Sequence, residues 1–115
     1  MTNSAVKKPS GLIVRELKAG SGASPKPGDR VKVNFEGTLR DGTVFDSSIK
    51  RGQPAVFQVG QVIPCWSEGL QTMKVGGKSH FVCPSALAYG DSGSPPRIRP
   101  GAALAFDVEL LEIEK

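Results

Sequence analysis

The stretch QVIPCWSEGLQTM, residues Gln61–Met73, decides the fold, because it is the only segment with the periodicity of a helix. Trp66, Leu70 and Met73 recur at i, i+4 and i+7, which places them on one helical face. Pro64 fits the first helical position, where its missing N–H costs nothing. A helix of about ten residues is marginal alone, so we expect this face to pack against a larger element.

The remainder of the chain has the pattern of antiparallel β-strands. The segments that predict strands, most of them by alternation of apolar and polar residues, are 12–18, 30–39, 43–46, 55–59, 80–83 and 104–110. Asp41–Gly42 is typical of a hairpin, and residues 47–54 of a polar bulge or loop. Leu111 and Ile113 break the last alternation, which indicates a β-bulge or a change of partner. We expect a loose tail over residues 1–10. Residues 11–115 then form one α+β domain, a five-stranded antiparallel half-barrel around one short helix.

Composition and charge exclude several function classes. The 115 residues fit one domain, and the net charge of +4 is spread over scattered basic residues without an aromatic ladder, which argues against nucleic-acid binding. The apolar run near the N-terminus, residues 12–14, is too short for a signal peptide or a membrane span. We therefore expect a cytoplasmic protein without membrane contact, or a periplasmic one if a leader has been trimmed.

The two cysteines and the single histidine predict no metal or redox site. Cys65 and Cys83 lie outside any CxxC motif, and His80 alternates outward in its strand, where a solvated side chain is expected. We interpret the cysteines as two small, partly buried thiols in a reducing compartment.

Standard catalytic motifs are missing, whereas large apolar residues gather near turns. The sequence has no GxSxG, P-loop, GxGxxG after a strand, or HExxH. Nine aromatic or branched residues form the gathered set: Phe35, Phe45, Phe57, Val62, Ile63, Trp66, Tyr89, Ile98 and Phe106. These nine residues either all belong to the hydrophobic core or line a cleft. Together they are more than the core of so small a sheet obviously needs.

Five blocks of sequence carry a resemblance to a known family. They are VNFEGTL (33–39), DGTVFDSS (41–48), VIPCWSEGL (62–70), AYG (88–90) and LAFDVEL (104–110). In this order they resemble the FKBP family, the macrolide-binding peptidyl-prolyl cis-trans isomerases, in a version similar to the bacterial branch. The resemblance extends from about Gly11 to Lys115 and implies a half-barrel wrapped on one short helix.

The resemblance also implies a site, its ligands and its chemistry. Trp66 is expected to floor a pocket walled by Phe35, Phe45, Phe57, Val62, Ile63 and Phe106 and rimmed by Asp46, Arg51, Tyr89 and Ile98. Asp46, Tyr89, Ile63 and Phe45 are the residues expected to act in catalysis, with Arg51 holding Asp46. The implied ligands are proline-containing peptides and proteins, with macrolides of the rapamycin type as inhibitors. We expect no cofactor and no metal, and we expect the protein to be a monomer.

Two departures from the family pattern leave alternatives open. Phe35 stands where tyrosine is common, so a hydroxyl that usually supports Asp46 is missing and activity is expected to be reduced. This favours, as a second reading, a weakly catalytic or non-catalytic module that binds proline or macrolides. A third reading is a basic scaffold whose pocket residues are core. Arg97 and Arg99 form a cationic rim, which leads to the hypothesis that acidic residues flanking the proline are favoured.

Overall fold

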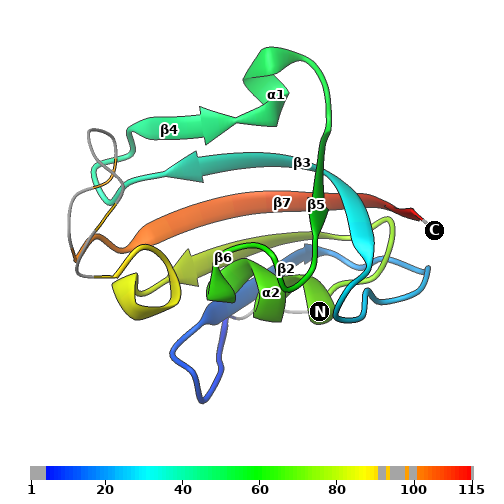
Figure 1. The fold of residues 1–115 in the computed structure, drawn as a ribbon, viewed down its shortest axis with the longest axis horizontal. Coiled ribbons are helices and arrows are strands. Elements are labelled where there is room, and N and C mark those ends of the chain that lie inside the picture. The colour runs from blue at the N-terminus through cyan, green and yellow to red at the C-terminus, as the bar shows by residue number, and fades with distance from the viewer. Residues whose placement is uncertain (1–4, 91–92, 94–97, 99–100, 115) are drawn as a thin grey trace.

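An antiparallel sheet packs against helix α2 in the computed structural model, which describes residues 5–90, 93, 98 and 101–114 (Figure 1). The strands are β1 (Val6–Lys7), β2 (Ile13–Lys18), β3 (Arg30–Thr38), β4 (Val44–Ser47), β5 (Ala55–Gln58), β6 (Lys78–Cys83) and β7 (Leu104–Glu114). The helices are α1 (Ser48–Arg51), α2 (Pro64–Gln71) and the 3₁₀ turn η1 (Ser85–Leu87). The predicted fold class, an α+β antiparallel sheet on one short helix, is confirmed.

The sheet has the order β1-β2-β6-β7-β3-β4, and β5 also pairs with β3. Strand β7 pairs with one edge of β3 along its whole length, from Arg30 to Thr38. The other edge of β3 is divided, with β4 against Glu36–Thr38 and β5 against Arg30–Val33. Helix α1 lies between these two short strands. The described residues thus form seven strands rather than five, because β4 and β5 share one position and β1 is added at the far edge.

Strand β7 carries the bulge that the sequence predicts. Lys32 of β3 is opposite Glu112, but the next residue, Val33, is opposite Leu110. Leu111 is therefore the extra residue on β7, and the change of register accounts for the break in alternation. The prediction is confirmed.

Helix α2 lies directly on β6. Trp66, Leu70 and Met73 are 4%, 0% and 3% exposed, so the predicted apolar face is buried. A Cβ built on Gly69 would come 2.6 Å from Cζ of Phe81, which shows that only a glycine allows the helix to approach the strand this closely. Helix α2 has eight residues. Within the described part of the chain, no helix is long and apolar enough to cross a membrane.

The N-terminal segment is more ordered than the loose tail expected for residues 1–10. Val6 and Lys7 pair with Val14 and Ile13 of β2, which supplies the backbone hydrogen bonds that an isolated segment lacks. Ser10 also donates a hydrogen bond from Oγ to Oε1 of Glu68 on α2, 2.5 Å away. Residues 1–4 of the predicted tail lie outside the described residues.

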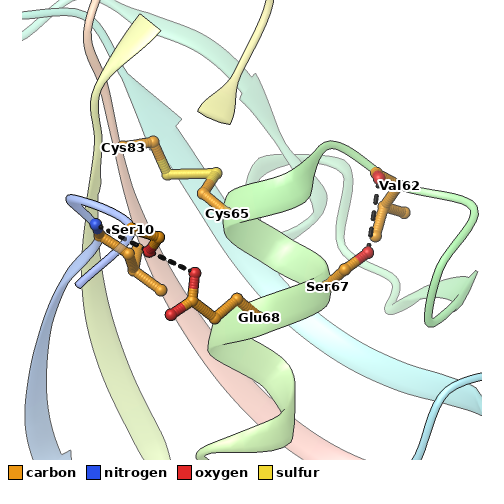
Figure 2. The surroundings of a disulfide bond; sticks show 7 residues. Ser10, Val62, Cys65, Ser67, Glu68 and Cys83 are labelled. Carbon is orange, nitrogen blue, oxygen red and sulfur yellow. Dashed lines mark hydrogen bonds between the residues drawn. A yellow bond between two sulfur atoms is a disulfide. The ribbon is translucent and has the colours of Figure 1, made fainter. Parts of the chain in front are cut away.

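Cys65 and Cys83 form a disulfide, so the prediction of two free thiols is wrong (Figure 2). Cys65 lies in the first turn of α2 and Cys83 at the end of β6. Their Cα atoms are 5.7 Å apart, within the usual range for a disulfide, and both side chains are fully buried. Spacing along the sequence could not reveal this proximity, which arises only because α2 lies on β6. The disulfide links the first turn of α2 covalently to the end of β6.

Candidate functional site

A cleft of about 320 Å³ opens beside the N-terminal end of α2. We call it the aromatic cleft. Its lining consists of Phe35, Phe45, Asp46, Phe57, Gln61, Val62, Ile63, Trp66, Tyr89 and Phe106. The structure thus brings nine of the eleven site residues expected from the sequence to one place.

Three phenylalanine rings pack on the indole of Trp66, and a fourth packs on one of these three. The ring centroids of Phe57, Phe35 and Phe106 lie 5.0, 5.1 and 5.3 Å from that of Trp66, all in edge-to-face geometry. Phe45 packs on Phe106 in the same way at 5.6 Å. Edge-to-face pairs stabilise a fixed arrangement of rings beyond the burial of their area. The cleft is therefore a preformed apolar hollow with Trp66 at its floor.

The segment before α2 is held so that it forms one wall of the cleft. Pro64 begins the helix, and Ile63, as the preceding residue, is extended. Oγ of Ser67 accepts a hydrogen bond from the N–H of Gly60 (3.1 Å) and donates one to the carbonyl of Val62 (3.4 Å), as Figure 2 shows for Val62. No other described residue accepts a hydrogen bond from the N–H of Ile63. This donor remains for a ligand.

Gly37 is a site residue that sequence reasoning missed. It is buried on β3, opposite Asp46 of β4 and Phe106 of β7. A Cβ at this position would lie 2.7 Å from Cζ of Phe45 and 2.8 Å from Cε1 of Phe106. The two rings occupy the space of a side chain, so the cleft depends on glycine here. The only signal in the sequence is a glycine inside an otherwise alternating strand.

Two serines, the last residue of β4 and the first of α1, fix the turn that carries the polar rim. The hydroxyl of Ser48 is fully buried and accepts the N–H of Phe35 at 2.8 Å. The hydroxyl of Ser47 accepts the N–H of Lys50 at 3.1 Å and so caps α1 at its N-terminus. Residues 48–51 are consequently helical, although a polar loop was expected over residues 47–54.

The rim carries an ion pair between Asp46 and Arg51. Nη1 of Arg51 lies 2.5 Å from Oδ1 of Asp46, and the guanidinium carbon lies 5.9 Å from the ring centroid of Phe35. Arg51 does not line the cleft itself but holds a residue that does. The pair implied by the resemblance is present. With phenylalanine at position 35, the ring supports Arg51 by a cation–π contact instead of offering a hydroxyl.

The remaining expected residues are placed differently. Tyr89 lines the cleft and is 38% exposed, whereas Ile98 is 4% exposed and is not among the lining residues. Gln61 lines the cleft and was not expected there; its position directly before Val62 and Ile63 is the only hint in the sequence. Arg97 and Arg99, the expected cationic rim, lie outside the described residues.

Replacing Arg51 by alanine should weaken ligand binding in the aromatic cleft without affecting the fold. The substitution removes an exposed ion pair and a cation–π contact, each worth about 0.5–1 kcal/mol, so we expect the dissociation constant to rise by roughly fivefold to thirtyfold. Arg51→Lys should recover part of this loss, because lysine keeps the charge but not the planar contact. Arg40→Ala is the matched control, since Arg40 is exposed in the β3–β4 turn and does not line the cleft. Equal dissociation constants for Arg51→Ala and the control would contradict the role of the pair.

The lining chemistry defines a class of site. Among the described residues that line the cleft, none is a serine, cysteine or histidine, and Asp46 is the one that carries charge. Elsewhere, His80 pairs with Asp107 at 2.8 Å, and the described residues contain no group of His, Cys, Asp and Glu able to hold a metal ion. Such a lining suits a compact apolar ligand and offers a few polar groups at its edge.

Comparison with known proteins places this class in a family. Residues 22–111 match the family model described as FKBP-type peptidyl-prolyl cis-trans isomerase. The FKBP-type peptidyl-prolyl cis-trans isomerase FkpA of Aeromonas hydrophila is 57% identical over 106 residues, which cover 92% of this chain and 39% of that protein. The chain belongs to the FKBP-type peptidyl-prolyl cis-trans isomerase family.

Solved structures agree with this assignment. The crystal structure of FkpA from Escherichia coli has a TM-score of 0.92 and 46% identity, and the match covers 96% of this chain and 51% of that one. The crystal structure of AtFKBP13 has a TM-score of 0.88 and 35% identity, and the match covers 96% of this chain and 99% of that one. The chain spans between 39% and 50% of the length of the first curated relatives that it matches.

Proposed function

We propose that this protein is a peptidyl-prolyl cis-trans isomerase that accelerates rotation about X–Pro bonds during protein folding. The observation that carries the proposal is the aromatic cleft, a preformed hollow beside the N–H of Ile63, which has no acceptor among the described residues. A pyrrolidine ring is small and apolar and fits a hollow floored by Trp66. The proposal also includes the binding of macrolides of the rapamycin type in the same cleft, as inhibitors.

The chemistry explains why no nucleophile is required. Rotation about an X–Pro bond must break amide resonance, which gives a barrier of about 20 kcal/mol and exchange times of tens of seconds or longer. No covalent bond changes. The planar amide is more polar than the twisted one and is stabilised more by water, so an apolar cleft that removes this water lowers the barrier.

Polar groups at the edge of the cleft then hold the twisted geometry. The N–H of Ile63 lies at the start of α2, where the partial positive charge of a helix N-terminus favours a carbonyl oxygen. The hydroxyl of Tyr89, which also lines the cleft, is a second donor. Asp46, fixed by Arg51, supplies a negative charge close to the rotating group.

The test is a protease-free measurement of cis-trans exchange on X–Pro peptides, with and without rapamycin. Catalysis that rapamycin inhibits supports the proposal. Rapamycin binding without catalysis would replace it by the second reading, a binding module, which the phenylalanine at position 35 favours. Neither binding nor catalysis would leave only the scaffold reading and overturn the proposal.

Asp46→Ala and Tyr89→Phe should each lower turnover while the melting temperature stays near that of the wild type. Each removes one polar interaction with the twisted amide. Such an interaction is worth about 0.5–1.5 kcal/mol, which corresponds to roughly a twofold to tenfold loss in kcat/KM. The measurement is peptide exchange at several substrate concentrations, with circular dichroism as the control for folding. Wild-type rates would remove the substituted residue from the mechanism.

We further propose that the protein works in an oxidising compartment and as a monomer. The first proposal replaces the cytoplasmic expectation and rests on the buried disulfide between Cys65 and Cys83, since such bonds persist in oxidising surroundings. The second keeps the monomer that the sequence led us to expect. Alkylation of thiols in acid-quenched cells should leave both cysteines unmodified until they are reduced, and sedimentation should give a mass near 12.1 kDa. Modified cysteines, or a dimer, would contradict the respective proposal.

A further inference from the structure

A second groove shares lining residues of β4 with the aromatic cleft. It has a volume of about 430 Å³ and is lined by Leu39, Val44, Phe45, Asp46, Ser47 and Lys50, among others. We call it the β4 groove. Phe45 and Asp46 line both hollows. A peptide whose proline occupies the aromatic cleft can therefore continue across these two residues into the β4 groove.

The charges along this path differ in whether they are neutralised. Asp46 forms its ion pair with Arg51, so its carboxylate already has a cationic partner. Lys50 is exposed, and no ion pair to another described residue is present for its ammonium group. The groove therefore presents one uncompensated positive charge.

The backbone fixes the two cations on different sides of Asp46. The cap that Ser47 provides for the N–H of Lys50 closes α1 as one helical turn. Lys50 and Arg51 are consecutive in that turn, so their side chains leave the helix in different directions. Arg51 reaches the cleft side of Asp46 and Phe35, whereas Lys50 lines the β4 groove. Leu39 and Val44 add apolar side chains to the lining of the groove.

We infer that the β4 groove binds the part of the substrate that flanks the proline and selects an acidic side chain there through Lys50. This inference rests on the proposed isomerase function and adds a preference to it. The apolar part of the lining holds the backbone and stem of a glutamate or aspartate, and the ammonium group of Lys50 pairs with its carboxylate. The preference is electrostatic at an exposed site, so it must weaken as salt screens the charges.

The experiment compares kcat/KM for peptides that differ only in carrying Glu, Gln or Lys two positions from the proline, in one series before it and one after it. For at least one series we expect kcat/KM to be about threefold to tenfold higher for the Glu peptide than for the Lys peptide at low salt. This ratio of kcat/KM values should fall towards one at about 1 M salt, where the screening length is about 3 Å. Lys50→Gln should remove the ratio and Lys50→Glu should reverse it.

The matched control is Lys78→Gln, which changes net charge equally at an exposed position on β6 that lines neither hollow. It should keep the wild-type ratio. A ratio near one in both series, or one that Lys50→Gln and Lys50→Glu leave unchanged, would overturn the inference. The Gln peptides distinguish failure of this inference from failure of the proposed function. If the wild-type protein accelerates exchange of the uncharged Gln peptides, it is an isomerase, whatever its preference for charge.

Discussion

Gly37→Ala is expected to lower kcat/KM by about tenfold or more and to weaken rapamycin binding by a similar factor. The added Cβ would come within 2.8 Å of the rings of both Phe45 and Phe106. Phe106 packs on Trp66 and on Phe45, so the rings can yield only by moving into the cleft. Overpacking of this kind costs about 1–3 kcal/mol, and here the displaced atoms fill the volume that a ligand needs.

The measurement must separate loss of the cleft from loss of the fold. Both assays should be done well below the melting temperature of Gly37→Ala, with circular dichroism to show that the variant is folded. Thr38→Ala is the control, because Thr38 is the next residue on β3 and does not line the cleft. Wild-type rapamycin affinity in Gly37→Ala would show that the cleft does not depend on this glycine.

Loss of the disulfide should have the largest effect on stability. Cys65 and Cys83 close a loop with a sequence separation of 18 residues, for which the chain-entropy model gives about 3 kcal/mol. In a domain of this size such a loss corresponds to a melting temperature lower by roughly 10–20 °C. Because Cys65 is adjacent to Trp66, and Cys83 precedes the segment that leads to Tyr89, rapamycin affinity should fall as well.

A reductant provides the test without any mutation. The melting temperature of the wild type should fall in dithiothreitol, towards the value of the double variant Cys65→Ala, Cys83→Ala. The double variant itself should not respond, which makes it the control for other effects of the reductant. An equal melting temperature in the presence and absence of dithiothreitol, after thiol titration has shown complete reduction, would contradict a stabilising role for the bond.

Features with a regular period were predictable from the sequence. The buried face of α2 and of the residues directly after it follows from the spacing of Trp66, Leu70 and Met73, and the bulge follows from the broken alternation at Leu111. Both depend on local geometry, which repeats along the chain. The lining of the aromatic cleft came instead from the family resemblance, because its residues lie on separate strands and loops.

Features that depend on contact between distant segments were not predictable. The disulfide requires that α2 lies on β6, and the role of Gly37 requires that two rings from neighbouring strands meet above it. Helix α1 was missed because its four residues are too few to show a period, although Ser47 is a typical capping residue. The pairing of Val6 and Lys7 with β2 likewise depends on an edge that only the folded sheet provides.

The divided edge of β3 separates the connection through α1 from the pairing of the sheet. Strands β4 and β5 are each anchored to their own stretch of β3, and the connection through α1 joins them. Arg51 of this connection contacts the ring of Phe35, whereas the residues that line the cleft lie outside it. Changes in the length of this connection would therefore alter what borders the cleft and leave the register of the strands as it is.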